Sequence, residues 1–272
     1  MLSQVQRSVK HFLPFYERER EECADSGGLH FVTSVTNILP KMPFIGDNAS
    51  KMFKPQLHIL PPPQRVLWDE LSSTPDTMTL YGGTAIALRL GHRFSVDFDF
   101  FSQVPFVPAD LMARIPYLAG GVVRQSSANT LTMTVEREGT VQVSYFGGLR
   151  IGQVNPHEVP EGGHCKVASL TDLAGMKVAV VTQRAEIKDY LDIHALLTQA
   201  DIPLSVMLSA ALAIYGEQFN PLIALKAISY HEDPSLAELP ESTRRDLIAA
   251  VRGVDAARLP KLSVTRTWEE SQ

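Results

Sequence analysis

Cysteine is scarce in this chain of 272 residues, which contains only Cys23 and Cys165. Two cysteines so far apart cannot provide the disulfide framework of a small secreted protein or the closely spaced ligands of a zinc knuckle. Long apolar runs are missing too. The most hydrophobic window, 202–215, is shorter than the roughly 20 residues needed to cross a bilayer. No export signal is recognisable near the N-terminus. We therefore expect a cytoplasmic protein that makes no use of a membrane.

The chain also lacks an excess of positive charge. Its 25 lysine and arginine residues are outnumbered by 30 aspartate and glutamate residues, so the formal net charge is −5. A strongly basic protein attracts nucleic acid over its whole surface. Here, any such contact needs a local patch. Residues 244–266 hold six basic residues against two acidic ones, which suits an RNA or partner surface and equally a solvated helix face.

The composition is otherwise that of a globular protein with a packed core, with 44% hydrophobic and 20% charged residues. Residues 1–55 combine an amphipathic pattern at 5–22 with glycines and prolines, and carry no catalytic pattern. The proline run at 61–63 disfavours a helix, so we expect one to begin just after it, at 64–71. We predict three parts: an N-terminal extension (1–55), a core (56–165) and a helical C-terminal part (166–272).

Strand and helix patterns alternate in the core. Four segments have the alternation or apolar content of strands: 78–81, 96–100, 130–137 and 140–146. Glu138 and Gly139 separate the last two and are typical of a β-hairpin turn. A short helix pattern at 84–90 ends at Gly91. Interleaved elements of this kind predict an α/β (α+β) fold with a mixed sheet.

After residue 169 the pattern becomes helical. The segment 169–172, Ser-Leu-Thr-Asp, resembles an N-capping signal. Helix-compatible spacing follows in five segments: 173–183, 187–198, 204–219, 222–228 and 244–254. These segments predict a helical bundle after the mixed sheet.

The segment 96–100 carries the sharpest chemical signal. Asp97 and Asp99 are two residues apart in a predicted strand, so their carboxylates project from one face and can share a divalent cation. Two adjacent carboxylates repel each other unless a cation or a basic neighbour neutralises them, and Mg²⁺ is a common solution. A solvated edge strand would show the same spacing, so both interpretations stay open for this pair alone.

A strand followed by Gly82, Gly83 and a helix lies shortly before the acidic pair. Backbone N–H groups at such a helix start suit phosphate oxygens, and Thr84 adds a hydroxyl. The two glycines alone indicate only a tight turn. Together with Asp97 and Asp99 they favour nucleotide chemistry, because one element can hold phosphates while the other holds their metal.

Residues 80–101, LYGGTAIALRLGHRFSVDFDFF, resemble the signature of the AbiEii family, the nucleotidyltransferase-like toxins of type IV toxin–antitoxin and abortive-infection systems. A second block, from 169–177 through Arg184 to Asp192, resembles the family's downstream lysine and R-x-x-x-K-D-x-x-D elements. The similarity covers about 57–255. It implies a polymerase-β-like nucleotidyltransferase core followed by a helical part.

The resemblance also implies a reaction and a set of site residues. The reaction moves a nucleoside monophosphate from an NTP to an acceptor hydroxyl, such as a tRNA 3′ end, and the family suggests a cognate antitoxin as a protein partner. Asp97 and Asp99 would bind Mg²⁺ (or Mn²⁺). The remaining assignments are nucleotide binding by Gly82, Gly83, Thr84, Arg93, Ser95 and Lys177, and catalysis by Asp97, Asp99, Lys177 and Asp189.

Structural explanations compete for several of these residues. Lys177 falls in a mostly apolar helix, where a lysine needs a path to solvent or an anionic partner. Lys188 and Asp192 are four residues apart and could form an ion pair on one helix face. Arg89, like its neighbours His92 and Arg93, could contact phosphate or an RNA backbone, or simply belong to a solvated helix end.

One position departs from the expected pattern. Polymerase-β-like enzymes usually carry a third carboxylate on a neighbouring strand, where this chain has Ser144. Because a neutral hydroxyl holds magnesium poorly, either Asp189 or Asp192 takes over that role or catalysis is weakened. The leading hypothesis is a Mg²⁺-dependent nucleotidyltransferase. Two alternatives are a nucleotide-binding interaction module without turnover, and phosphoryl transfer to a protein hydroxyl such as that of Ser95.

Overall fold

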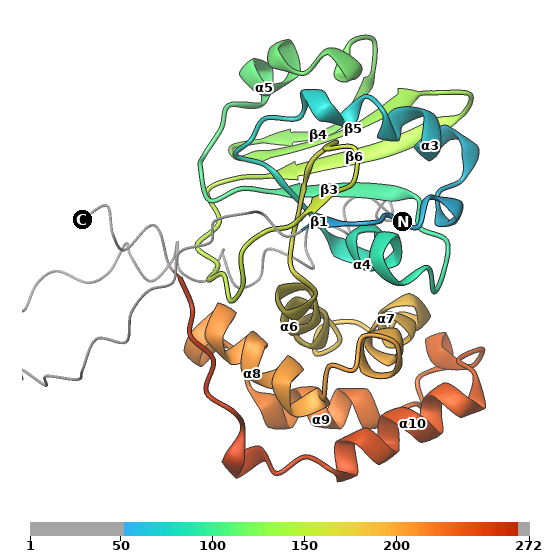
Figure 1. Cartoon of the computed structure of the whole chain (residues 1–272), viewed down its shortest axis with the longest axis vertical. Helices are drawn as coiled ribbons and strands as arrows, with labels where there is room; N and C mark the ends of the chain where they lie inside the picture. The colour runs from blue at the N-terminus through green and yellow to red at the C-terminus, as the bar shows by residue number, and fades with distance from the viewer. Residues whose placement is uncertain (1–51, 266–272) are drawn as a thin grey trace, which may run out of the picture.

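A computed structural model describes residues 52–265, which form a mixed β-sheet with a layer of helices below it (Figure 1). The pattern at 5–22 and Cys23 lie outside the described residues. Six strands form the main sheet, in the order β4-β5-β6-β3-β2-β8. Their bounds are β2 Thr79–Tyr81, β3 Asp97–Phe101, β4 Val122–Ser127, β5 Thr130–Glu136, β6 Thr140–Phe146 and β8 Lys166–Val167. A separate parallel pair joins β1 (Met52–Phe53) to β7 (Val159–Pro160).

Strand β3 lies inside the sheet, antiparallel to β2 and parallel to β6. This register places Asp99 directly opposite Tyr81 on one side and Ser144 on the other. Residues that face each other across neighbouring strands project from the same face of the sheet. The three side chains of this row therefore belong to one surface.

The predicted hairpin is confirmed. Strands β5 and β6 pair antiparallel, from Thr130 opposite Phe146 to Glu136 opposite Thr140. In the connection between them, Glu138 and Gly139 both have positive φ (57° and 145°). Positive φ at both positions suits the right-handed twist of the two strands. Strand β4 was not predicted, since its mostly exposed side chains lack a buried face that would create alternation.

The proline run corrects one expectation. Instead of preceding a helix, Pro62 and Pro63 are the first two residues of α3 (Pro62–Trp68). A proline is tolerated in the first turn because the N–H it lacks has no partner within the helix there. The predicted start at residue 64 was therefore too late.

Helix α4 (Gly82–Leu90) begins directly where β2 ends, two residues before the predicted start. Its end at Gly91 is confirmed, and this glycine has a positive φ of 67°. A left-handed residue after the last turn is the usual way to end a helix, and glycine adopts it without steric cost. Helix α5 (Pro108–Arg114), which lies above the sheet in Figure 1, away from the helical layer, was not predicted.

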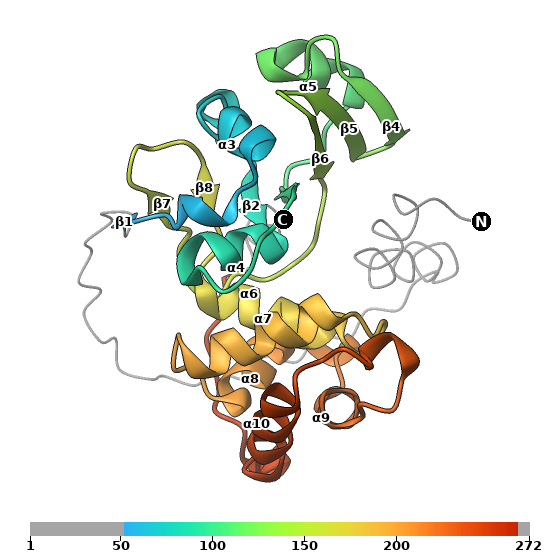
Figure 2. The ribbon, with the colours of Figure 1, turned by 90° about the vertical axis from the view of Figure 1, so that its right-hand side faces the viewer.

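The helical half confirms the sequence pattern closely. It contains α6 (Leu170–Val180), α7 (Ile187–Thr198), α8 (Leu204–Tyr215), α9 (Pro221–Ser229) and α10 (Glu241–Arg252). The Ser169 hydroxyl accepts a hydrogen bond from the Asp172 N–H (3.1 Å), as the capping signal predicted. Helices α4, α6 and α7 lie between the sheet and the outer helices α8 to α10 (Figure 2).

The predicted class, an α/β fold with a mixed sheet followed by helices, is thus present. Strand β8, at the start of the predicted C-terminal part, pairs with β2 and so belongs to the sheet; the division into three parts stays a prediction. Among residues 52–265, no helix combines the length and the apolar character that a membrane span requires.

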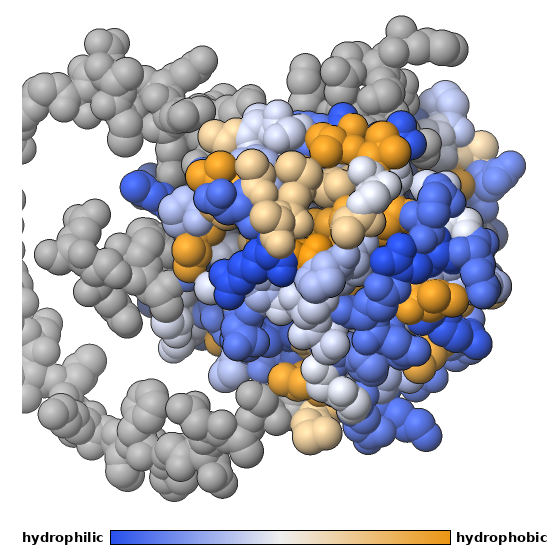
Figure 3. Space-filling model, turned by 90° about the horizontal axis from the view of Figure 1, so that it is seen from above, coloured by the Kyte–Doolittle hydropathy of each residue, from blue (hydrophilic) through white to orange (hydrophobic). Residues whose placement is uncertain are grey.

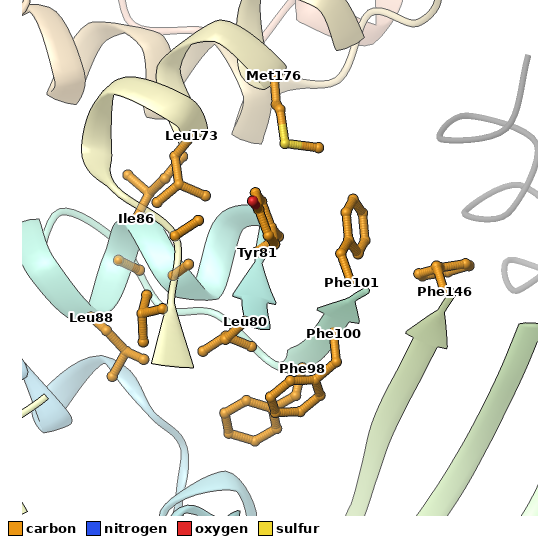
Figure 4. Close-up of a cluster of buried hydrophobic side chains, with 14 of the residues drawn as sticks. Leu80, Tyr81, Ile86, Leu88, Phe98, Phe100, Phe101, Phe146, Leu173 and Met176 are labelled. Carbon is orange, nitrogen blue, oxygen red and sulfur yellow. The ribbon is translucent and has the colours of Figure 1, made fainter. Parts of the chain in front are cut away.

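The two faces of β2 and β3 differ (Figure 4). Leu80, Phe98 and Phe100 point to the side away from α6 and are fully buried, whereas Tyr81 and Phe101 point towards α6. Fully burying a phenylalanine contributes roughly 1.5–3 kcal/mol, so the phenylalanine face anchors the strand. Side chains alternate along a strand. Asp97 and Asp99 therefore project towards the helical half.

Seen from above, the sheet end of the molecule carries apolar side chains among polar ones (Figure 3). Large exposed apolar residues of the described chain include Val104 and Val107, on the loop before α5, and Val122 and Val123, on β4.

Candidate active site

The turn between β2 and α4 lies against the acidic pair. Gly82 has a φ of 76°, and a Cβ at this position would lie 3.0 Å from Oδ2 of Asp99. Gly82 therefore meets two demands at once, a left-handed backbone and close approach of a carboxylate. The structure brings together the glycine turn and the acidic strand that the sequence predicted to face each other.

Thr84 and Ser95 hold the loop that joins α4 to β3. The Thr84 hydroxyl donates to the backbone carbonyl of Asp97 and lies 2.7 Å from Oγ of Ser95. Both side chains are buried. Their hydroxyls thus fix the position of Asp97 relative to the start of α4, and direct contact of either with a nucleotide stays a prediction.

Gly83 lies beneath the guanidinium of Arg93. A Cβ on Gly83 would overlap with Nη2 of Arg93. The guanidinium crosses this glycine and donates from Nε to Oδ1 of Asp192 (2.6 Å) and from Nη2 to Oδ2 (2.9 Å). This bidentate pairing holds Arg93 in a single orientation at the start of α4.

Asp192 is the meeting point of three basic side chains. Besides Arg93, its carboxylate contacts Nε2 of His92 (2.7 Å) and Nζ of Lys177 (2.9 Å). The expected ion pair between Lys188 and Asp192 is therefore wrong. Lys188 instead pairs with a carboxylate outside this group, Glu186, at 3.0 Å.

Asp189 lies one turn earlier on α7 and is equally enclosed. It accepts from Nζ of Lys177 (2.8 Å) and from Nε of Arg184 (2.8 Å). The side chains of Asp189 and Asp192 are fully buried, so each needs these cations to remain charged. Arg184 was not assigned to the site from the sequence, although it lies only five residues before Asp189.

The four carboxylates separate into two pairs by their pKa. Burial and the charge of Asp97 raise the pKa of Asp99 to about 6, against the opposing hydrogen bond from Ser144. Burial also raises the pKa of Asp97, although the nearby Lys188 and Arg93 charges oppose it. This pair is short of positive charge, so a cation placed between the two carboxylates would stabilise it.

Asp189 and Asp192 behave in the opposite way. Burial would raise their pKa values, but Lys177 outweighs it at both positions, together with Arg184 at Asp189 and with His92 and Arg93 at Asp192. The pKa of each is lowered. These carboxylates are already neutralised by protein cations, and they are poorly suited to accept a proton or to serve as metal ligands.

The donor set of Asp97 and Asp99 fits Mg²⁺. Carboxylate oxygens are its preferred protein ligands, and it commonly keeps several waters and uses only one or two carboxylates. Ser144 stands opposite Asp99, buried and hydrogen-bonded to it. Within residues 52–265, no group of three or more histidine, cysteine, aspartate or glutamate side chains could hold a metal ion. Any metal here would rely on two carboxylates.

Two other basic residues singled out in the sequence have structural roles. The Arg89 guanidinium pairs with Glu158 and donates to the carbonyl of Ala168 (2.6 Å), which fastens α4 to the segments around β8. Arg244 donates to four backbone carbonyls, those of His231, Leu236, Ala237 and Leu239. The rest of the basic patch is exposed as far as it is described, at Arg245, Arg252, Arg258 and Lys261.

A partly buried acidic pair beside a glycine turn at the start of a helix defines a site suited to a metal-bound polyphosphate. The sequence profile of the family described as "Nucleotidyl transferase AbiEii toxin, Type IV TA system" matches residues 65–268, most of the chain. The chain belongs to this family of nucleotidyltransferase toxins. The predicted resemblance is thereby confirmed.

Individual relatives are more distant. An uncharacterized protein of Aquifex aeolicus (strain VF5), aq_aa25, is 30% identical over 156 residues, which cover 57% of this chain and 73% of that protein. Among solved structures, MenT4, the nucleotidyltransferase toxin Rv2826c from Mycobacterium tuberculosis H37Rv, is similar with a TM-score of 0.47 and 14% identity, covering 71% of this chain and 84% of MenT4. JHP933 from Helicobacter pylori has a TM-score of 0.44 and 18% identity, covering 70% and 87%.

Proposed function

We propose that the chain is a Mg²⁺-dependent nucleotidyltransferase that moves a nucleoside monophosphate from an NTP to an acceptor hydroxyl. The observation that carries this proposal is the Asp99 carboxylate packed against Gly82, with Asp97 on the same face of β3. One surface thereby offers ligands for a metal and the N-terminus of α4 for phosphate oxygens.

The triphosphate is held by the first turn of α4 and the neighbouring cations. Backbone N–H groups at Gly82, Gly83 and Thr84 face the phosphates, while Arg93 adds a positive charge directly above Gly83. Lys177 supplies a second cation, fixed by Asp189 and Asp192. Asp189 therefore acts as a positioning residue for Lys177. Preorganised charges of this kind stabilise a transition state without reorganisation during the reaction.

Transfer joins the acceptor oxygen to the α-phosphorus and breaks the bond between that phosphorus and the bridging oxygen, so that pyrophosphate leaves. A Mg²⁺ ion held by Asp97 and Asp99 supplies neutralisation of phosphate charge. The hydroxyl proton passes to water in this scheme. The position opposite Asp99 carries Ser144, and Asp189 and Asp192 are already occupied by cations.

The acceptor is proposed to be an RNA hydroxyl, with the 3′ end of tRNA as the first candidate, because the family consists of toxins of type IV toxin–antitoxin systems. An antitoxin would then be the protein partner, and the cytoplasm the site of action. Ser95 is a poor acceptor for phosphoryl transfer, since its hydroxyl is buried against Thr84.

The proposal is tested by incubating the protein with each α-labelled NTP, MgCl₂ and total tRNA. We expect label on RNA, lost on addition of a chelator and reduced by roughly 100-fold or more in Asp97→Asn and Asp99→Asn, since each removes a metal ligand. Asp110→Asn, which removes an exposed carboxylate on α5, is the matched control. Nucleotide binding with no transfer under Mg²⁺ or Mn²⁺ would instead support the interaction module suggested by Ser144.

A further inference from the structure

A cavity lies between strands β2 and β3 and the loop 151–157, outside the site described above. It is partly open to solvent and has a volume of about 150 Å³. Its walls include the rings of Tyr81 and Phe101 and the imidazole of His157, and Thr77 and Val104 lie exposed at its rim. An apolar cavity of this volume accommodates a ring the size of benzene.

The register of the sheet places this cavity beside Asp99. Tyr81 is directly opposite Asp99, and Phe101 follows Asp99 by two residues on the same face of β3. Two residues of a strand span roughly 7 Å. Tyr81 and Phe101 point towards α6 in Figure 4, the side to which Asp99 also projects. Asp99 and the cavity therefore lie on the same face of the sheet, two strand residues apart.

The walls select for a flat and uncharged group. The Tyr81 and Phe101 rings are stacked, with centroids 5.0 Å apart and planes at 19°, and no charged side chain of the described chain lines the cavity. Burial lowers the pKa of His157 to about 4, so its imidazole is neutral at pH 7. Its ring nitrogens lie 3.2 Å from the Thr79 hydroxyl and 3.4 Å from the Tyr81 hydroxyl. The charge of Lys166 acts on His157 from outside the cavity and does not line it.

The cavity is also fixed in shape. The loop that forms one wall is held by Asp172, whose carboxylate accepts from the N–H groups of Val154 (2.6 Å) and Asn155 (3.0 Å). The N–H of Gly152 donates to the carbonyl of Ile214 on α8 (3.3 Å), which joins the loop to the helical half. Binding therefore requires little ordering of the wall.

We propose that this cavity binds a nucleobase, which stacks beside Tyr81 and Phe101 and meets the imidazole of His157. The inference rests on the proposed function and names a second contact of its substrates. The base belongs either to the NTP or to the acceptor RNA. Both share the required chemistry of a planar, neutral, hydrogen-bonding ring.

Binding is measured first without any transfer, by saturation-transfer NMR on the full chain in metal-free buffer. The probes are the four ribonucleosides, with ribose 5-phosphate as the ligand that lacks a base. Val104→Trp closes the rim without removing a buried contact, because Val104 is 52% exposed. Val107→Trp, at a similarly exposed valine on the same loop, is the matched control. Thr77→Trp repeats the test from another rim position, and circular dichroism checks that each variant folds.

We expect nucleosides but not ribose 5-phosphate to bind, and Val104→Trp and Thr77→Trp to weaken this binding by roughly 10-fold or more while Val107→Trp leaves it unchanged. Equal binding of ribose 5-phosphate, or unaltered binding in both rim variants, would overturn the inference. This measurement needs neither metal nor acceptor, so a failure of nucleoside binding can be distinguished from a failure of the transfer reaction.

Transfer assays then identify the source of the base. A rise in KM for the NTP in Val104→Trp, with kcat retained, assigns the cavity to the NTP base. A rise in KM for total tRNA alone assigns it to the acceptor. If nucleoside binding is lost but both KM values and kcat stay at the wild-type level, the cavity has no part in the reaction and the inference is wrong.

Discussion

Arg93 crosses over Gly83 to reach Asp192, so that a loop residue after α4 and a helix residue on α7 meet above the first turn of α4. Only a glycine leaves room for the guanidinium at this point. The glycine thus serves two purposes: it exposes backbone N–H groups, and it leaves space for the Arg93 guanidinium. The second purpose is visible only in three dimensions.

Gly83→Ala is expected to displace the Arg93 guanidinium and to lower transfer by roughly 100-fold, because small misplacements of positioning groups are costly. The fold should survive, since the displaced atoms are the end of a flexible side chain. Transfer rates and melting temperatures are compared with those of Gly253→Ala, where an added Cβ meets only ordinary contacts. If Gly83→Ala and Arg93→Ala act through one contact, the double variant loses no more activity than the worse single variant.

Asp192→Ala is expected to destabilise the protein by about 3–5 kcal/mol, because it leaves the buried Lys177 and Arg93 without their shared carboxylate. Asp246→Ala serves as a control, since Asp246, which pairs with His194, is half exposed and should contribute under about 1 kcal/mol. Urea denaturation of both variants measures the difference. If both variants lose an equally small free energy of unfolding, the buried ion pairs around Asp192 do not stabilise the fold.

Ser144→Asp is expected to create the three-carboxylate site that the sequence lacks. In metal-free buffer the new charge opposite Asp99 should cost roughly 1–3 kcal/mol, because a like charge is added beside a partly buried pair. Mg²⁺ or Mn²⁺ should then raise the melting temperature more than it does for wild type. Ser144→Asn controls for size. If neither Mg²⁺ nor Mn²⁺ changes the melting temperature of Ser144→Asp, a metal position between Asp97 and Asp99 would be contradicted.

His157 makes stability depend on pH. Burial, aided by the charge of Lys166, lowers its folded-state pKa from 6.5 to about 4. Between these values the unfolded chain binds more protons than the folded one, so this contribution is complete above about pH 6.5 and decreases as the pH falls towards 4. The loss should reach up to roughly 3 kcal/mol. His157→Gln should flatten this part of the profile, as measured by urea midpoints from pH 4.5 to 7.5, while a slope equal to that of wild type would show that His157 is not responsible.

Local features were predictable because they depend on neighbouring residues. The alternation of Asp97 and Asp99 with buried phenylalanines, the turn at Glu138 and Gly139 and the cap at Ser169 all follow from periods or spacings of a few residues. The exception at Pro62 and Pro63 is also local, since the first turn of a helix accepts residues that its interior does not.

Contacts between distant segments were not predictable from spacing. Lys188 and Asp192 have the separation of a helical ion pair, yet Asp192 is buried and faces Arg93 and Lys177, whereas Lys188 pairs with Glu186. A buried carboxylate takes the partners that the packing of other elements brings to it, and burial is a property of the whole fold.

The order of residues alone therefore determined the strand, turn and helix that present Asp97, Asp99 and the two glycines, together with the family of the protein. Tertiary structure decided which charges are compensated and which are not. Packing α7 beside α4 and α6 supplies cations to Asp189 and Asp192, while Asp97 and Asp99 remain deficient in positive charge. The reason is physical: the charge state of a buried carboxylate depends on the distance to cations that approach from other parts of the chain.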